Sequence, residues 1–288
     1  MLTGNKKLSK IFKALRINRL PYMPFVLNVE PGNICNLKCP LCPTGRGDSS
    51  LVKGFLTLKN FKNIFDQFKG RLKTVNLYSW GEPLLNPEFF DIVRYIKRAN
   101  KKIYVVTSTN LNIDDKSCMD NLISCGVDEL IVSCDGAGED TYTHYRRGGD
   151  FNLVVRNMKY LSSKRKEVLS VTRIVWNFLV FRHNEHEVEK ARAMAEGIGV
   201  EFRVGLMRTY MKDEILKPHK EAIAKDIDWI PDKSEYSAYD KERLAPKKVI
   251  KTCRKPWQEI TVNWNGEVFP CCAIYGDGFS VADTNLAP

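Results

Sequence analysis

The pattern that most constrains the fold of this chain is a repeated alternation between short apolar runs and amphipathic helical segments. The apolar runs predict strands over residues 26–29, 75–78, 103–107, 130–133, 171–180 and 202–204. The intervening segments predict helices over residues 58–68, 88–99, 115–124, 139–145, 153–162 and 185–196, the last of them ending at Gly197. This alternation predicts an α/β fold in which helices cover a parallel sheet. In such folds, binding sites form at the C-terminal ends of the strands.

The alternation of strands and helices stops after the sixth predicted strand. Residues 206–252 are charged, contain three prolines and predict a linker with one or two helices. The run EITVNWNGEVFPCC then predicts a hairpin, with arms at 260–262 and 268–269 joined by a tight turn at Asn265-Gly266. We therefore predict four parts: a basic N-terminal helix (1–22), an α/β domain (23–205), the linker (206–252) and a small cysteine-containing module (253–288).

Composition and charge are those of a globular protein with a basic surface. The 288 residues are 43% hydrophobic and carry a formal net charge of +11. No apolar stretch approaches the ~20 residues of a membrane span, so no transmembrane segment is expected. The basic N-terminus has no apolar core like that of a signal peptide, and a surface helix is favoured over membrane docking there. The excess charge could attract nucleic acid, anionic lipid or an acidic redox protein. The absence of an aromatic-interleaved RNA motif argues against nucleic acid.

The cysteines indicate metal ligation. Their number, nine, is odd, and no secretion signal accompanies them, which favours a reducing cytoplasm over disulfides. Cys35, Cys39 and Cys42 follow the first predicted strand with the spacing C-x3-C-x2-C. Soft thiolates select zinc, copper(I) or iron–sulfur clusters. A closed zinc site needs four ligands, whereas a 4Fe–4S cube held by three keeps one iron open. A zinc knuckle or incidental thiols are the alternatives.

This spacing resembles the signature of the radical S-adenosylmethionine (radical SAM) enzymes. The resemblance implies an open, partial (β/α)6 TIM-like barrel whose 4Fe–4S cluster binds SAM at the open iron. It implies that the reduced cluster cleaves SAM to a 5′-deoxyadenosyl radical, which abstracts a substrate hydrogen. An acidic flavodoxin or ferredoxin would donate the electron. Leu41, inside the cysteine loop, occupies the position that packs near the adenine in relatives.

Segments after the later strands resemble the family's SAM-binding segments. Trp80-Gly81-Glu82-Pro83 resembles the G-G-E-P segment, with tryptophan in place of the first glycine. The resemblance assigns Glu82 to the SAM ammonium, and Gly81 would let the backbone approach the ligand closely.

Two further strand ends extend this resemblance. Thr109 and Asn110 would contact the methionine part of SAM, and Ser133 and Asp135 the ribose or carboxylate. Period-two alternation would point Ser133 and Asp135 the same way. No catalytic histidine or other catalytic residue is assigned. Arg146-Arg147 is either a contact for an anionic substrate or a solvated turn.

The C-terminal cysteines resemble a second module of the same enzymes. Cys253-x12-Gly266-x4-Cys271 resembles the start of a SPASM or shorter "twitch" extension, in which a hairpin holds auxiliary iron–sulfur ligands. Cys253, Cys271 and Cys272 are therefore expected to be auxiliary ligands, with a zinc half-site or a disulfide as alternatives. Three thiolates are too few for a complete module. We expect either that the chain is a truncated fragment, or that an earlier cysteine or a non-cysteine ligand completes the site.

The sequence thus predicts a cytoplasmic radical SAM enzyme. The expected reaction is oxidation or modification of a peptide, a protein or a sugar-like substrate. A cyclase resembling the molybdopterin-precursor enzymes is one alternative. A non-catalytic zinc or iron–sulfur protein is the other.

Overall fold

The computed structural model describes residues 11–15, 22–47, 52–209, 219–248, 253–271 and 280–284. Its main sheet has the strand order β11-β10-β9-β1-β2-β3-β4-β5-β6. Six neighbouring strands are parallel: β1 (Val26–Val29), β2 (Thr74–Leu77), β3 (Tyr104–Thr109), β4 (Glu129–Ser133), β5 (Arg173–Val180) and β6 (Glu201–Leu206). The helices between them are α2 (Leu58–Asp66), α3 (Phe89–Ala99), α4 (Lys116–Ser124), α5 (Glu139–Tyr145), α6 (Phe151–Glu167) and α7 (Val188–Ile198).

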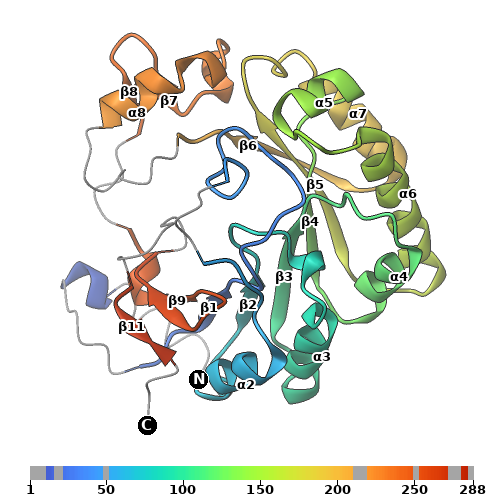
Figure 1. Cartoon of the computed structure of the whole chain (residues 1–288), viewed down its shortest axis with the longest axis vertical. Helices are drawn as coiled ribbons and strands as arrows, with labels where there is room; N and C mark the ends of the chain where they lie inside the picture. The colour runs from blue at the N-terminus through green and yellow to red at the C-terminus, as the bar shows by residue number, and fades with distance from the viewer. Residues whose placement is uncertain are drawn as a thin grey trace.

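The helices lie along the outer side of the curved sheet, so the predicted partial (β/α)6 barrel is confirmed (Figure 1). Helix α3 shows why this packing forms. Phe89, Ile92, Val93 and Ile96 recur at helical spacing and are fully buried against the sheet. Full burial of one such side chain contributes about 1.5–3 kcal/mol. No helix within the described ranges has the length and apolar character that a membrane crossing needs. Of the predicted N-terminal helix, residues 11–14 are helical, while 1–10 and 16–21 lie outside the described residues.

Helix α7 ends later than predicted. The sequence suggested an end at Gly197, but the helix continues to Ile198. Gly199 follows in the left-handed conformation, with φ 80°, and its N–H donates to the carbonyls of Ala195 and Glu196. A residue with positive φ just past a helix is the usual position for a capping glycine. Gly197 is therefore an ordinary residue of the last turn.

Residues 219–248 do more than connect two parts of the chain. They form α8 (His219–Lys225), three-residue 3-10 turns at Ile227–Trp229 and Ser234–Tyr236, and a small antiparallel pair, β7 (Tyr239–Asp240) and β8 (Ala245–Pro246). Ile223 and Ile230 are buried in one apolar cluster with Leu37 and Leu41 of the cysteine loop. This segment therefore supports the cysteine loop from outside the barrel.

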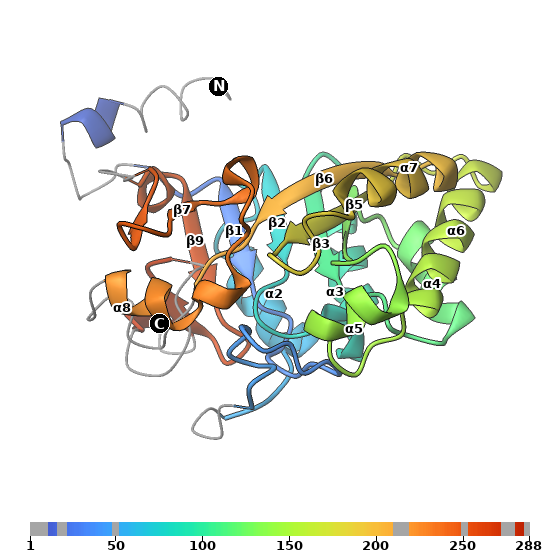
Figure 2. The ribbon, with the colours of Figure 1, turned by 90° about the horizontal axis from the view of Figure 1, so that it is seen from above.

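The predicted C-terminal hairpin is present, but it is not a separate layer. Its arms are β9 (Glu259–Val262) and β10 (Glu267–Phe269), and β11 (Ala282–Asp283) adds a third short strand. Strand β9 pairs in parallel with β1, so the hairpin extends the barrel sheet (Figure 2). Asn28 of β1 donates to the Glu259 carboxylate at 3.0 Å across this junction.

Candidate active site

A cavity of about 200 Å³ lies at the C-terminal ends of β1 to β4. Most residues that the sequence predicts as ligands line it: Cys35, Cys39, Leu41, Cys42, Gly81, Glu82, Thr109, Asn110 and Ser133. The rest of the lining consists of Leu37, Gly45, Ser79, Trp80, Ser108, Tyr145 and Arg146. Asp135 does not line the cavity. Segments far apart in the sequence therefore meet at the end of the sheet where α/β folds build sites.

The cysteine loop follows β1 and is closed by its own backbone. The N–H of Cys42 donates to the carbonyl of Cys39 at 3.1 Å, and the N–H of Arg46 donates to that of Cys42 at 2.9 Å. Gly45 crosses this turn so closely that an added Cβ would lie 2.5 Å from the Cys39 nitrogen. Backbone atoms cannot yield as a flexible side chain can, so the close approach requires glycine.

The cysteine sulfurs are held at the cavity wall by neighbouring donors. Cys35 Sγ accepts from the Leu37 N–H at 3.4 Å and from Asn110 Nδ2 at 3.7 Å. Cys39 Sγ accepts from Arg146 Nη1 at 3.9 Å. Burial raises the pKa of Cys35 to about 12 and also raises the pKa of Cys39, which Arg146 partly offsets. Ligation of a metal would therefore displace protons from these thiols.

The cavity fits a cluster better than a single metal ion. Among the described residues, no three His, Cys, Asp or Glu side chains converge where one ion could bind them all. In a 4Fe–4S cube, each thiolate binds a different iron, so three ligands need not converge on one point. Cys35, Cys39 and Cys42 all border one cavity. This arrangement suits soft ligation of a multi-iron group.

Glu82 is a buried carboxylate at the cavity wall. It is 3% exposed, and its Oε1 accepts from the Leu84 N–H at 3.1 Å. Its Oε2 accepts from the Asn110 N–H at 2.7 Å. Burial raises the pKa of Glu82, and these backbone donors act against the rise. Gly81 packs directly against the backbone of Gly32. A Cβ added at Gly81 would lie 2.1 Å from the Gly32 carbonyl oxygen.

The ends of β3 and β4 present small polar groups. Ser108 and Ser133 have hydroxyl oxygens 3.4 Å apart, and either can donate. Asn110 Nδ2 donates to Asn36 Oδ1 at 2.8 Å and so ties the end of β3 to the cysteine loop. Thr109 also lines the cavity, and its hydroxyl accepts from a backbone N–H at 2.9 Å. These contacts fix the wall before any ligand binds.

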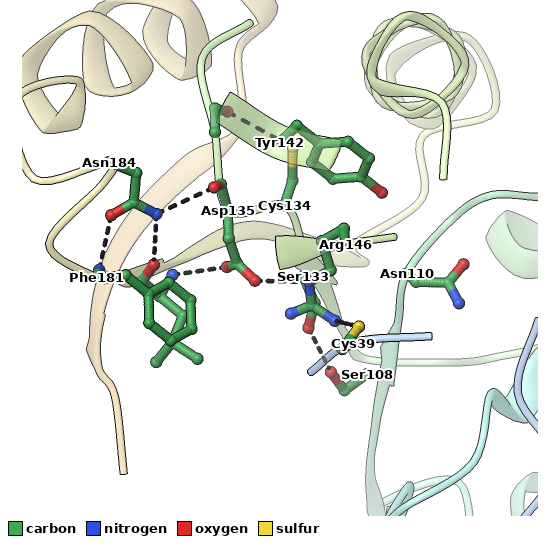
Figure 3. A network of polar contacts seen from close by, with 12 residues as sticks. Cys39, Ser108, Asn110, Ser133, Cys134, Asp135, Tyr142, Arg146, Phe181 and Asn184 are labelled. Carbon is green, nitrogen blue, oxygen red and sulfur yellow. Dashed lines mark hydrogen bonds and ion pairs between the residues drawn. The ribbon is translucent and has the colours of Figure 1, made fainter. Parts of the chain in front are cut away.

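Asp135 lies behind the cavity and holds Arg146 in its wall (Figure 3). The carboxylate is fully buried; one oxygen accepts from the Leu179 N–H at 2.7 Å and the other from Arg146 Nε at 2.5 Å. The Arg146 guanidinium also lies 5.4 Å from the centre of the Tyr145 ring. Burial works against its charge, but Asp135 and Cys39 hold the pKa of Arg146 well above its usual value. Asp135 thus holds the Arg146 cation at the cavity surface, and its own contact with SAM stays a prediction.

Asn184 fixes this ion pair from the far side (Figure 3). Its Nδ2 donates to the carbonyls of Asp135 at 3.0 Å and Leu179 at 2.9 Å. Its Oδ1 accepts from the Phe181 N–H at 2.7 Å. The ends of β4 and β5 are therefore bound to each other around the buried carboxylate.

The C-terminal cysteines are only partly described. Cys253 is exposed and Cys271 is half-buried, and they flank the hairpin of β9 and β10. Cys272 lies outside the described residues. Sequence reasoning also gave no role to Gly45 or Tyr145, and left Arg146 open. Gly45 alone had a usable signal, because a glycine inside a ligand loop often marks a close backbone approach.

Comparisons with known proteins agree with this geometry. Residues 29–195 match the Radical SAM superfamily, and residues 253–285 match the SPASM iron-sulfur cluster-binding domain. The chain is similar to the AdoMet-dependent heme synthase of Methanosarcina barkeri, with 31% identity over 166 residues, which are 57% of this chain and 45% of that protein. It is also similar to AlbA, the antilisterial bacteriocin subtilosin biosynthesis protein of Bacillus subtilis, with 24% identity over 295 residues, 97% of this chain and 61% of that protein.

The fold is shared with SuiB of Streptococcus suis. The crystal structure of SuiB bound to the precursor peptide SuiA gives a TM-score of 0.66 at 15% identity, over 98% of this chain and 67% of that one. The structure of SuiB bound to S-adenosylmethionine gives a TM-score of 0.64 at 14% identity, over 98% and 74%. The match to the heme synthase spans about half of that protein's length. Because the superfamily match covers more than half of its residues, the chain belongs to the radical SAM superfamily.

Proposed function

We propose that this chain cleaves SAM reductively and abstracts a hydrogen atom from a peptide, as a step in peptide modification. The cofactors of such a protein are a 4Fe–4S cluster, SAM and, with a SPASM module, an auxiliary iron–sulfur cluster. When bound, the cluster supplies the electron that breaks the sulfonium C–S bond to form the 5′-deoxyadenosyl radical. The observation that carries the proposal is a cavity lined by three cysteines, a buried carboxylate and a partly buried guanidinium.

Those two charges match the amino-acid end of SAM, which is a zwitterion. Glu82 uses its two oxygens for the N–H groups of Leu84 and Asn110, and a carboxylate has further acceptor sites for an ammonium. Arg146 donates through Nε to Asp135 and through Nη1 to Cys39, so its Nη2 group can donate hydrogen bonds to the SAM carboxylate. We assign the ammonium to Glu82 and the carboxylate to Arg146.

The remaining wall suits the rest of SAM. Leu41, Trp80 and Tyr145 supply apolar and aromatic surface for the adenine. Ser133 and the Thr109–Asn110 strand end supply donors and acceptors for the ribose and the methionine chain. A wall of this kind excludes water from a reactive species, which limits side reactions.

We assign the auxiliary cluster to the C-terminal module, with Cys253, Cys271 and Cys272 among its ligands. The net reaction would then be an oxidation in which the module accepts the substrate electron. The domain division is proposed as predicted, at residues 23–205 and 253–288. An acidic flavodoxin or ferredoxin in the cytoplasm is the proposed electron donor for this basic protein.

A peptide substrate is favoured by two similar proteins. AlbA acts in biosynthesis of a bacteriocin, and SuiB binds a precursor peptide. A small-molecule substrate is the second candidate, because the 31% identical relative is a heme synthase. The two candidate substrates predict different results when turnover is measured with a panel of precursor peptides and tetrapyrroles. Turnover should depend on added peptide in the first case and on added tetrapyrrole in the second.

The decisive experiment measures 5′-deoxyadenosine after anaerobic reconstitution and dithionite reduction. Wild-type protein should produce it, and Cys35→Ala, Cys39→Ala and Cys42→Ala should each abolish it, because three ligands leave none to spare. Iron and sulfide content, with the ultraviolet–visible spectrum, is determined on the same samples. A protein that takes up only zinc, or a cysteine variant that cleaves SAM normally, would end the proposal.

A further inference from the structure

The end of the sheet opposite the cavity combines exposed cations with an exposed apolar loop. Strands β2 to β5 begin at this end, and backbone hydrogen bonds join the residues at or next to their first positions in one row. Tyr104 N–H donates to the Lys73 carbonyl, Asp128 N–H to that of Val105, and Arg173 N–H to that of Asp128. We call this the strand-start face, formed by residues 66–74, 97–104, 124–129, 164–173 and 196–201.

An apolar loop projects from this face. Val168, Leu169 and Val171 are 48%, 88% and 87% exposed. The loop is well anchored: Ser170 N–H donates to the Arg165 carbonyl at 2.9 Å, and Ser170 Oγ donates to that of Ile123 at 3.3 Å. Leu169 has φ 53°, a conformation that non-glycine residues rarely adopt. The fold thus fixes large apolar side chains in solvent, and backbone strain of this kind is often kept where it serves a function.

The same face keeps a surplus of positive charge. Its acidic side chains are mostly paired with local cations: Asp66 with Lys69, Asp128 with Lys97, Glu167 with Lys164, and Glu201 with Arg173. Glu196 is exposed and has no ion pair within the described residues. Five exposed cations likewise have no ion pair with any described residue: Arg71, Arg98, Lys101, Lys102 and Lys166. The unpaired charge of the face is therefore strongly positive.

We infer that the strand-start face docks on an anionic lipid bilayer, with the 168–171 loop inserted among the headgroups. Stable peripheral binding takes two signals, an apolar insertion and a basic patch, and this face carries both. Leu169 and Val171 project almost fully into solvent, which suits insertion into a fluid phase, whereas a protein partner would need matching pockets. An electron donor has no reason to dock here, because the cysteines lie at the other end of the strands. Docking in this orientation leaves the cavity open to the aqueous side.

The test uses the reconstituted protein and co-sedimentation with vesicles. The vesicles contain phosphatidylcholine alone, or an equal mixture of phosphatidylcholine and phosphatidylglycerol. Wild-type protein should bind only the anionic vesicles, and added salt should weaken the binding. Leu169→Ser with Val171→Ser, and separately Lys101→Glu with Lys102→Glu, should each lower the partition coefficient about tenfold or more.

Matched controls lie near the cysteine loop, at the other end of the sheet. Val52 is 74% exposed, and Lys53 and Lys59 are exposed. The single variant Val52→Ser should leave vesicle binding unchanged. The double variant Lys53→Glu with Lys59→Glu should also leave it unchanged, although it alters the net charge as much as Lys101→Glu with Lys102→Glu does. The inference is wrong if neutral vesicles bind equally well, if controls and test variants lose binding equally, or if no vesicle binds. Thermal unfolding of each variant shows whether lost binding reflects lost folding. Formation of a complex with an acidic protein, without vesicle binding, would also overturn it.

Discussion

Replacing Arg146 with methionine should damage stability and SAM binding for two separate reasons. Asp135 is fully buried, burial already raises its pKa, and the substitution would remove the cation that compensates its charge. Removing one member of a buried ion pair costs about 3–5 kcal/mol of unfolding free energy. If Arg146 also holds the SAM carboxylate, loss of a hydrogen bond to a charged group costs about 1.5–3 kcal/mol. The SAM dissociation constant should then rise about ten- to hundredfold.

A second substitution separates the two effects. Asp135→Asn removes the buried charge but keeps an oxygen that can accept from the Leu179 N–H. The double variant Asp135→Asn/Arg146→Met should therefore recover much of the lost unfolding free energy. It should not recover SAM affinity, because no cation returns to the cavity wall. Such non-additivity is expected for residues in direct contact.

The measurements are urea unfolding and titration of SAM into the reconstituted protein. Arg147→Met is the matched control, because the neighbouring arginine is exposed and does not line the cavity. It should alter neither quantity by more than about 0.5 kcal/mol. If the double variant recovers stability and SAM affinity together, Arg146 has only a structural role. If Arg146→Met binds SAM normally, the zwitterion assignment is refuted.

Three further predictions follow from the cavity and its surroundings. Glu82→Gln should raise the SAM dissociation constant about ten- to hundredfold while iron content stays normal; unchanged affinity would remove Glu82 from the site. Gly45→Ala should prevent cluster assembly because its Cβ meets the Cys39 backbone, whereas Gly70→Ala, with no atom within 4 Å of the added Cβ, should reconstitute normally. Burial raises the pKa of Glu30 from 4.5 to about 7, so stability should fall as pH rises through this window. Glu30→Gln should flatten that fall in urea unfolding between about pH 5 and pH 8, and an unaltered pH profile would contradict the burial argument.

The barrel could be predicted from the sequence because its strands and helices are specified locally. The residues of β1 were predicted without error, and α5 likewise, since apolar periodicity and turn residues mark their limits. The end of α7 was missed because two glycines compete there and only the backbone conformation at Gly199 decides between them. Helix α6 runs from Phe151 to Glu167, longer than predicted, because its last turns are charged and leave no apolar stripe.

The placement of the C-terminal hairpin could not be predicted in the same way. The Asn265-Gly266 turn and the alternating arms indicate that β9 and β10 pair with each other. Nothing local indicates that β9 also pairs with β1, because that contact joins Val26 to Glu259 across most of the chain. The strand with which β9 pairs is therefore decided by which edge of the sheet remains unpaired once the barrel has formed.

The Ser133–Asp135 segment shows where the sequence argument about the site reaches its limit. Period-two alternation placed both side chains toward SAM, but alternation holds only within a strand, and β4 ends at Ser133. Ser133 faces the cavity, whereas Asp135, two residues past the strand, turns inward to Leu179 and Arg146. The cation that reaches the cavity comes from the end of α5, next to a second arginine that stays exposed. The contact with the buried Asp135 carboxylate distinguishes Arg146 from its neighbour, and no local sequence pattern reveals that contact.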